Sequence, residues 1–277
     1  MSSSQPLISV IIPTHNRAVL LQRALNSVVG QRYKNLELII VDDSSKDNTE
    51  DIVKNYQDRV KITYIKNNVA VGACAARNIG INAAEGVFIA GLDDDDTWHP
   101  DRVFELHANY SSEYAFVTSD VLIMKDKTQH VWRKKSVLTL NDLLYSNQVG
   151  NQVLVEKERV LEVGGFDENL TAAQDYDLWI RLCSKYGPIR NVQKVLQTVY
   201  EEESRDRITT SYSKKIDGYL RFYNKHKSKM DIKQRKYQLY LMRRKLYKRL
   251  TVKEFFNYIP VSRYLKEAKR ILRSKID

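Results

Sequence analysis

The stretch Val87-Phe88-Ile89-Ala90-Gly91-Leu92-Asp93-Asp94-Asp95-Asp96 places four consecutive carboxylates directly after an apolar run. A short apolar run bounded by turn residues predicts a buried strand. In open α/β sheets, ligands bind outside the carboxyl ends of the strands. Like charges a few ångströms apart repel by about 1 kcal/mol in water and about 4 kcal/mol near a protein surface. The four carboxylates therefore need either solvation by water or a divalent cation.

Two interpretations of residues 93–96 stay open at this point. Mg²⁺ and Mn²⁺ prefer oxygen ligands and are commonly shared with substrate phosphates, which favours a metal and diphosphate site. The alternative is an exposed acidic turn that caps the next helix, since Asp is favoured at helix N-termini. For a metal site, we predict Asp95 as the ligand and Asp94 as the residue near a ribose.

Strand and helix patterns alternate on both sides of this segment. Strands are predicted at 8–12, 36–41, 60–65 and 87–92, and helices at 17–29, 48–56 and 72–85. This order predicts an α/β fold with a mostly parallel sheet and helices on both faces. The later pattern is mixed, with helices at about 101–112, 141–146 and 175–186 and strands near 114–124, 130–136, 153–155 and 195–200.

Charge divides the chain into two regions. The 277 residues carry a net charge of +11, but residues 211–277 alone hold 21 Lys/Arg and 5 Asp/Glu. The other 210 residues hold 24 basic and 29 acidic side chains. We predict a globular domain at 1–205 and a basic helical C-terminal extension at 206–277.

Tyrosines are interleaved with the basic residues of this extension. Basic amphipathic helices with aromatic side chains can lie on anionic membranes, gaining about 1 kcal/mol per basic residue. The alternatives are a solvated helical face packed on the preceding domain and an oligomer contact. We predict peripheral contact with an anionic membrane and leave the oligomeric state open. No nucleic-acid partner is expected, because no nucleic-acid-binding fold or motif accompanies the charge.

The chain reads as a cytoplasmic protein. Residues 1–6 lack the basic and apolar regions of a signal peptide, and no run of 18 apolar residues predicts a membrane span. Cys74 and Cys183 fall in predicted helices, where they are expected to be core residues of a protein in a reducing compartment.

Two further carboxylates stand where chemistry is possible. Asp43 follows the strand at 36–41, where a carboxylate can accept hydrogen bonds from a nucleobase or a ribose. Asp175 opens a helix whose dipole stabilises an ionised general base. Each can instead be a helix cap. Asp177 lies roughly 200° round the helix from Asp175, so the two cannot share one role.

Together these segments resemble inverting glycosyltransferase family 2, which adopts the GT-A fold. The resemblance covers about residues 7–200, and each motif is weak by itself while the ordered set is specific. The matching segments are SVIIPTHNR (9–17), ELIIVDDSS (37–45), GACAARNIG (72–80), LDDDD (92–96), GGFDE (164–168) and QDYDLW (174–179).

The resemblance implies a role for each matching residue. The segment Pro13, Thr14 and His15 is expected to line the nucleotide pocket, and Asp43 to contact the base. Asp93 and Asp94 are expected to bind the nucleotide sugar, and Asp95 to bind Mn²⁺ or Mg²⁺. The base that deprotonates the acceptor hydroxyl is expected to be Asp175.

Two positions leave questions. Arg77 is expected to brace residues 93–96, called the acidic loop from here on, or the donor, with a surface counter-charge as the alternative. Gln174 stands where many relatives have Glu, so the base Asp175 is kept but a role for a second carboxylate at position 174 is not expected.

The resemblance implies an activity. The enzyme is expected to move a hexose or N-acetylhexosamine from a UDP-sugar to a saccharide acceptor through an oxocarbenium-like transition state. A polyprenyl-diphosphate-linked glycan of an O-antigen or capsule, at the inner face of the cell membrane, is the expected acceptor. The alternatives are a non-catalytic sugar-nucleotide or polysaccharide-binding protein with the same fold, and a transferase acting on lipopolysaccharide core.

Overall fold

The computed structural model describes residues 5–126, 128–201, 212–247, 256–261, 264–265 and 267. The chain forms two compact units. The larger unit comprises residues 1–140, 148–168 and 174–205, and the smaller comprises 141–147, 169–173 and 206–277. The short segments 141–147 and 169–173 thus belong with the C-terminal part of the chain. A separately folding domain that ends at residue 205 stays a prediction.

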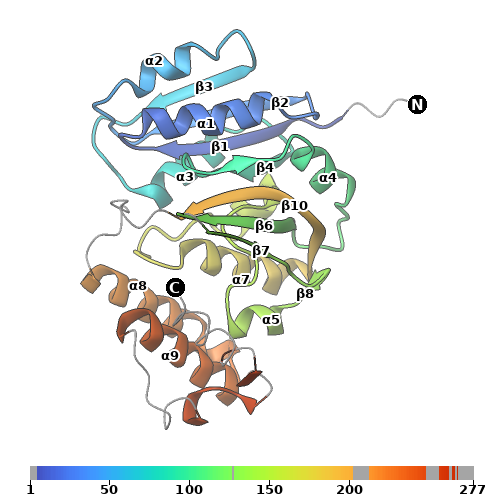
Figure 1. Ribbon diagram of the computed structural model, residues 1–277, viewed down its shortest axis with the longest axis vertical. Coiled ribbons are helices and arrows are strands. Elements are labelled where there is room, and N and C mark those ends of the chain that lie inside the picture. The colour runs from blue at the N-terminus through green and yellow to red at the C-terminus, as the bar shows by residue number, and fades with distance from the viewer. Residues whose placement is uncertain are drawn as a thin grey trace. The chain divides into compact units, whose positions relative to one another are not determined.

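Within the described residues, the larger unit is built on one sheet of ten strands (Figure 1). The main order is β3-β2-β1-β4-β9-β6-β10-β5, with β7 paired to β6 and β8 to β10. The strands are β1 (Ile8–Thr14), β2 (Leu36–Asp42), β3 (Lys61–Lys66), β4 (Phe88–Gly91), β5 (Thr97–Trp98), β6 (Val117–Lys125), β7 (Thr128–Trp132), β8 (Val137–Leu138), β9 (Leu154–Glu156) and β10 (Ile189–Glu201). The helices of this unit are α1 (Ala18–Val29), α2 (Thr49–Lys54), α3 (Ala73–Ala83), α4 (Arg102–Ala108), α6 (Lys157–Glu162) and α7 (Gln174–Tyr186).

The first four strands of the chain are parallel. β1 pairs with both β2 and β4, and β2 pairs with β3, with α1, α2 and α3 in the connections. β9 runs antiparallel to β4 and β6, so the complete sheet is mixed. The predicted α/β class with helices around a central sheet is confirmed, and the parallel arrangement holds for β1–β4 and for the β6–β10 pair.

Alternate residues of the central strands pack on opposite faces. Val10 of β1 belongs to a core cluster with Leu21 and Leu25 of α1. On the other face, α3 approaches so closely that a Cβ on Gly80 would lie 2.6 Å from Ile11 Cγ2. Both faces are therefore buried, which explains the continuous apolar runs. The edge left for polar groups is the carboxyl ends of the strands.

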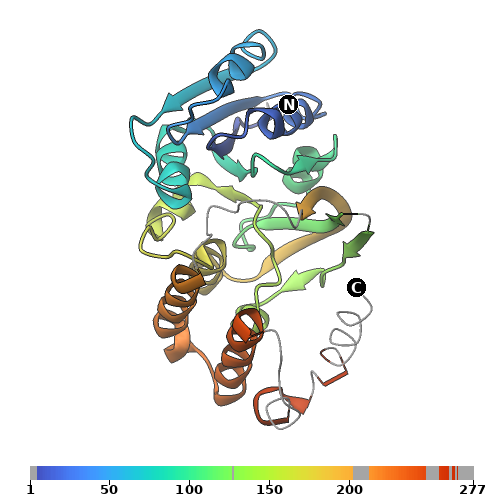
Figure 2. The same ribbon diagram turned by 60° about the vertical axis from the view of Figure 1, so that its left-hand side comes forward.

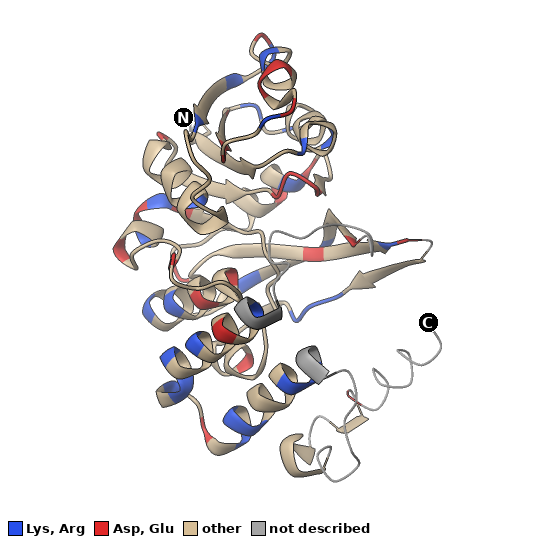
Figure 3. Ribbon diagram, turned by 90° about the vertical axis from the view of Figure 1, so that its left-hand side faces the viewer, with Lys and Arg blue, Asp and Glu red and all other residues tan. Residues whose placement is uncertain are grey.

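The smaller unit is helical. It contains most of α5 (Leu140–Tyr145), α8 (Tyr212–His226), a 3-10 turn (Lys227–Lys229) and α9 (Ile232–Tyr247). Helices α8 and α9 lie side by side (Figures 1 and 2). Gln234 Nε2 donates to Asn141 Oδ1 at 2.9 Å, and Gln238 Nε2 donates to Leu144 O at 3.0 Å, so α9 is tied to α5. Lys and Arg recur along α8 and α9 (Figure 3). Most of residues 261–276, which belong to the predicted basic extension, lie outside the described residues.

Candidate active site

The carboxyl ends of β1 and β2 bring the residues expected to bind the nucleotide together. Pro13 and Thr14 end β1, and Asp43 follows β2. The Asp43 N–H donates to Thr14 O at 2.8 Å, and His15 Nδ1 lies 2.6 Å from Asp43 O. The parallel register of the two strands therefore places Thr14, His15 and Asp43 in one hydrogen-bonded group, with Pro13 next to Thr14 in β1.

The Asp43 carboxylate anchors the segment that enters α3. It accepts hydrogen bonds from Asn67 Nδ2 at 2.9 Å and from the N–H groups of Val71 and Gly72, each at 2.8 Å. A carboxylate offers about four acceptor positions. Three donors of the chain itself therefore leave Asp43 little capacity for a bound base.

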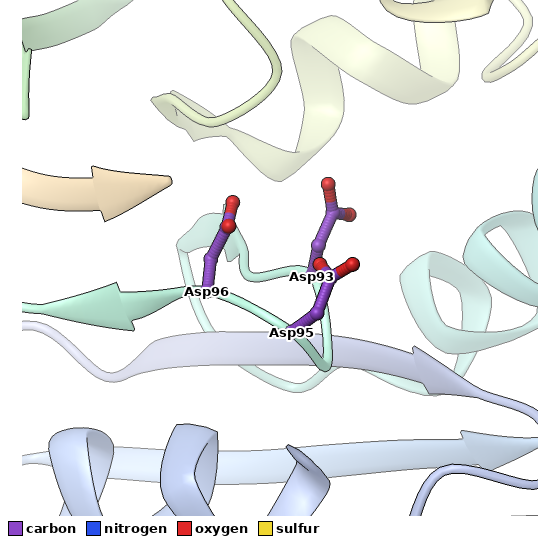
Figure 4. Close-up of side chains that lie close together, drawn as sticks. All are labelled: Asp93, Asp95 and Asp96. Atoms are coloured by element: carbon purple, nitrogen blue, oxygen red, sulfur yellow. The ribbon is translucent and has the colours of Figure 1, made fainter. Parts of the chain in front are cut away.

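Three of the four consecutive aspartates form one group. Oxygen atoms of Asp93, Asp95 and Asp96 lie within 4.8 Å of one another on the loop that follows β4 (Figure 4). Asp94 lies apart from this group and is buried. Its Oδ2 accepts from Thr14 Oγ1 at 2.8 Å, and its Oδ1 accepts from Arg17 at 3.1 Å. The resemblance did not assign a role to Asp96.

Burial makes these charges costly. Desolvation raises the pKa of Asp94 to about 6; Arg17 opposes the shift and Asp95 adds to it. Desolvation, followed by repulsion from Asp93 and Asp95, raises the pKa of Asp96 well above its usual value. A cation placed among the three carboxylates would relieve this repulsion.

Arginines from two helices surround the acidic loop. Arg17, which precedes α1, lies 3.1 Å from Asp94 and 3.2 Å from Asp95. Arg23 of α1 donates to the backbone carbonyl of Asp95. Arg77 of α3 lies 2.7 Å from Asp93. Burial by itself lowers the pKa of Arg77, but Asp93 and Asp175 raise it overall, so its charge is retained.

Two amide side chains also reach the acidic loop. Asn151 Nδ2 donates to Asp93 Oδ2 at 2.5 Å, and Gln152 Nε2 donates to Asp96 Oδ2 at 2.7 Å. No sequence motif indicated them. They lie in an irregular segment before β9, where residue type and spacing carry no signal of a site.

Asp175 lies in the first turn of α7, as the sequence predicted. Its Oδ1 is buried and has no hydrogen-bond partner among the described residues. Desolvation raises its pKa to about 6; Arg77 lowers the value and Asp93 raises it further. Asp177 is different, because it is fully buried and paired with Arg181 at 2.8 Å.

A cavity borders Arg77 and the acidic loop. A cavity of about 40 Å³ is lined by Arg77, Asp93 and Asn151 together with apolar side chains that include Phe166 and Trp179. A cavity needs about 10–15 Å³ to hold one water molecule. Apolar walls with a few polar groups are typical of small-molecule sites.

The chain is similar to known proteins in sequence and in fold. The family model described as glycosyl transferase family 2 matches residues 9–163. One relative is WcaA of Escherichia coli (strain K12), which is named as a colanic acid biosynthesis glycosyl transferase. It is 37% identical over 93% of this chain and 95% of its own length.

A second relative and a solved structure add to this picture. The GalNAc(5)-diNAcBac-PP-undecaprenol beta-1,3-glucosyltransferase of Campylobacter jejuni is 33% identical over 64% of this chain and 60% of its own length. The structure of S. aureus TarS 1–349 in complex with UDP-GlcNAc superposes with a TM-score of 0.70 at 17% identity, covering 93% of this chain and 77% of that one.

The family model covers more than half of the chain, and the E. coli relative matches nearly all of it. The chain therefore belongs to glycosyl transferase family 2.

Proposed function

We propose that this chain is a metal-dependent inverting transferase that moves a hexose or N-acetylhexosamine from a UDP-sugar to a saccharide acceptor. The observation that carries the proposal is that Asp175 lies near the acidic loop, with Arg77 between them. Asp93 of the acidic loop is paired with Arg77, and Arg77 is close enough to Asp175 to lower its pKa. A leaving diphosphate and an acceptor hydroxyl would thus meet in one place.

The acidic loop fits a divalent cation. Asp95 is the proposed ligand, with Asp93 and Asp96 next to it, and all three offer the hard oxygen atoms that Mn²⁺ and Mg²⁺ prefer. When bound, such an ion would neutralise the diphosphate and stabilise it as a leaving group. Burial, followed by repulsion from Asp93 and Asp95, raises the pKa of Asp96, and a cation held by these carboxylates would relieve that repulsion.

Pro13, Thr14, His15 and Asp43 are proposed to line the nucleotide site. Asp43 shares hydrogen bonds with Thr14 and His15 at the carboxyl edge of the sheet, and Pro13 precedes Thr14 in β1. TarS, which shares this fold, binds UDP-GlcNAc, and this supports UDP as the nucleotide. Asp94 is proposed to act near the ribose while it holds Thr14 and Arg17 in place.

Asp175 is proposed to deprotonate the acceptor hydroxyl. Its buried Oδ1 has no partner among the described residues, so a lone pair is available for that proton. Attack by the resulting oxygen at the anomeric carbon breaks the bond to the diphosphate oxygen and inverts the configuration. General base catalysis of this kind contributes about 10²–10⁴-fold.

The proposed acceptor is a polyprenyl-diphosphate-linked glycan of a bacterial surface polysaccharide. The name of the Campylobacter relative includes a glycan on PP-undecaprenol, which supports a polyprenyl-linked acceptor, and the name of the E. coli relative refers to the biosynthesis of a polysaccharide, colanic acid. Among the described residues, no helix combines the length and apolarity that a bilayer crossing requires. We propose that the Lys and Arg residues along α8 and α9 contact the anionic inner surface of the cell membrane.

The experiment measures UDP release from a panel of UDP-sugars. We expect turnover that stops with EDTA and returns with Mn²⁺, and that Asp95→Ala abolishes. The exposed Asp58 provides the control, since Asp58→Ala removes a carboxylate far from the acidic loop in sequence and should leave turnover unchanged. Tight donor binding without turnover, unaffected by chelation, would instead identify a sugar-nucleotide-binding protein.

A further inference from the structure

A short segment before β9 is held by several elements of the larger unit. Lys134 Nζ donates to Val149 O at 2.6 Å, and Trp179 Nε1 of α7 donates to Gly150 O at 2.9 Å. Asn151 and Gln152 follow directly, and their side chains reach the acidic loop. We call residues 149–152 the amide loop.

The amide of Asn151 bridges two carboxylates. Its Nδ2 lies 2.5 Å from Asp93 Oδ2 and 3.3 Å from Asp96 Oδ2, and its Oδ1 accepts from Gln197 Nε2 at 3.1 Å. Ionised carboxylates only accept hydrogen bonds, so the nitrogen has to face them. The bond from Gln197 favours the same orientation of the amide.

Gln152 supports Asp96 from the buried side. Its Nε2 donates to Asp96 Oδ2 at 2.7 Å, while its Oε1 accepts from Trp98 Nε1 at 2.6 Å. Its backbone carbonyl accepts from Arg102 at 3.3 Å. Gln152 is 1% exposed, so its side chain has one fixed arrangement.

We infer that Asn151 is a positioning residue that fixes the Asp93 and Asp96 carboxylates at the separation and orientation in which they face the divalent cation. This inference rests on the proposed function. A neutral amide suits the task, because it fixes both carboxylates without neutralising the charge that attracts the cation. A Lys or Arg at this position would compete with the metal, and an Asp would add to the repulsion.

The amide loop also connects the two carboxylate sites. Trp179, which holds Gly150, lies four residues after Asp175 on α7, and residues four apart share one face of a helix. The contact from Asn151 to Asp93 then leads directly to the acidic loop. One rigid segment therefore sets the separation between the proposed cation ligands and the proposed base.

The test measures Mn²⁺ affinity of the full chain from the electron paramagnetic resonance signal of free Mn²⁺. Asn151→Ala should bind Mn²⁺ about 10–100-fold more weakly, the usual effect of removing a group that orients metal ligands. Gln197→Met keeps the volume but not the N–H donor, so the Asn151 amide can turn, and a smaller loss is expected. Asn35, which is exposed and donates to Gln5 O, provides the control, and Asn35→Ala should match the wild type.

The thermal unfolding midpoint of each metal-free protein accompanies these measurements. A weaker affinity at an unchanged midpoint separates positioning from a general loss of structure. If Asn151→Ala does not fold, Gln197→Met carries the test. Wild-type affinity in the folded variant overturns the inference and leaves the proposed function intact. A wild-type chain that binds no Mn²⁺ overturns the metal assignment together with the inference.

Discussion

At the scale of single residues, the raised pKa of Asp175 predicts the acid limb of the activity profile. A general base has to be ionised, and desolvation places this pKa at about 6. We expect kcat to fall about tenfold for each pH unit below that value, while Asp175→Asn binds donor but loses transfer. Initial rates between pH 4.5 and 8.5, with donor affinity measured at each pH, check this. A kcat that stays constant down to pH 4.5 would contradict the assignment.

The same shift predicts that Asp175 lowers the stability of the fold at neutral pH. A raised pKa means that the folded state binds the proton more tightly than the unfolded state. Its contribution to stability is thus full near pH 4 and is lost as the pH rises through about 6. Asp175→Asn should raise the free energy of unfolding at pH 7.5 by about 1–3 kcal/mol, and by less at pH 5.

Urea unfolding at the two pH values measures this difference. Asp177→Asn is the matched control, since Asp177 lies two residues after Asp175 on the same helix. This substitution removes the buried negative charge that pairs with Arg181, so it should destabilise the protein at pH 7.5. If both variants lose stability equally at pH 7.5, the Asp175 carboxylate stabilises the fold, and the prediction that its buried charge destabilises it is wrong.

The sequence could indicate part of the candidate site because that part lies at the ends of regular elements. Asp43, Asp95 and Asp175 each follow a strand or begin a helix, where residue type and position together indicate a role. Asn151 lies in an irregular segment and contacts Asp93, which is 58 residues earlier in the chain. Only the folded chain brings those two together.

At the scale of elements, the turn into β4 depends on a glycine. A Cβ on Gly86 would lie 2.7 Å from the backbone nitrogen of Ser9 and 2.8 Å from the carbonyl oxygen of Leu7, and neither atom can move without shifting β1. Gly86→Ala should lower the free energy of unfolding by about 1–3 kcal/mol. Gly91→Ala is the control, since nothing lies within 4 Å of its Cβ. Chemical denaturation that ranks the two variants equally would contradict this.

Strands with a regular apolar pattern were predicted well, whereas β10, whose pairing is irregular, was predicted only in part. The predicted strands at 8–12, 36–41 and 60–65 match β1, β2 and β3 closely. The strand expected at 195–200 is part of β10, which spans Ile189–Glu201 and shifts its register twice against β6. Irregular pairing breaks the alternation of side chains on which such a prediction depends. The short helix α6 was not predicted.

At the scale of the whole molecule, the uneven charge distribution reappears in the smaller unit. Lys229, Lys233 and Lys236 are exposed on the 3-10 turn and α9, and Ile232 between them is 72% exposed. Truncation after residue 205 is a poor test of their role, because it would also remove α9 from α5, to which Gln234 and Gln238 bind it. Surface substitutions in the full chain avoid that problem.

Reversing these charges should therefore weaken membrane binding without unfolding the unit. Each basic residue near an anionic surface contributes about 1 kcal/mol, so Lys229→Glu, Lys233→Glu and Lys236→Glu together should lower partitioning onto phosphatidylglycerol vesicles by about 100-fold or more. The control reverses the exposed Lys34, Lys54 and Arg59 of the larger unit, with the same change in net charge. Co-sedimentation at low and high salt measures both sets. Equal losses in the two would show that net charge alone drives binding, and unchanged binding in the first set would rule out α9 as the membrane surface.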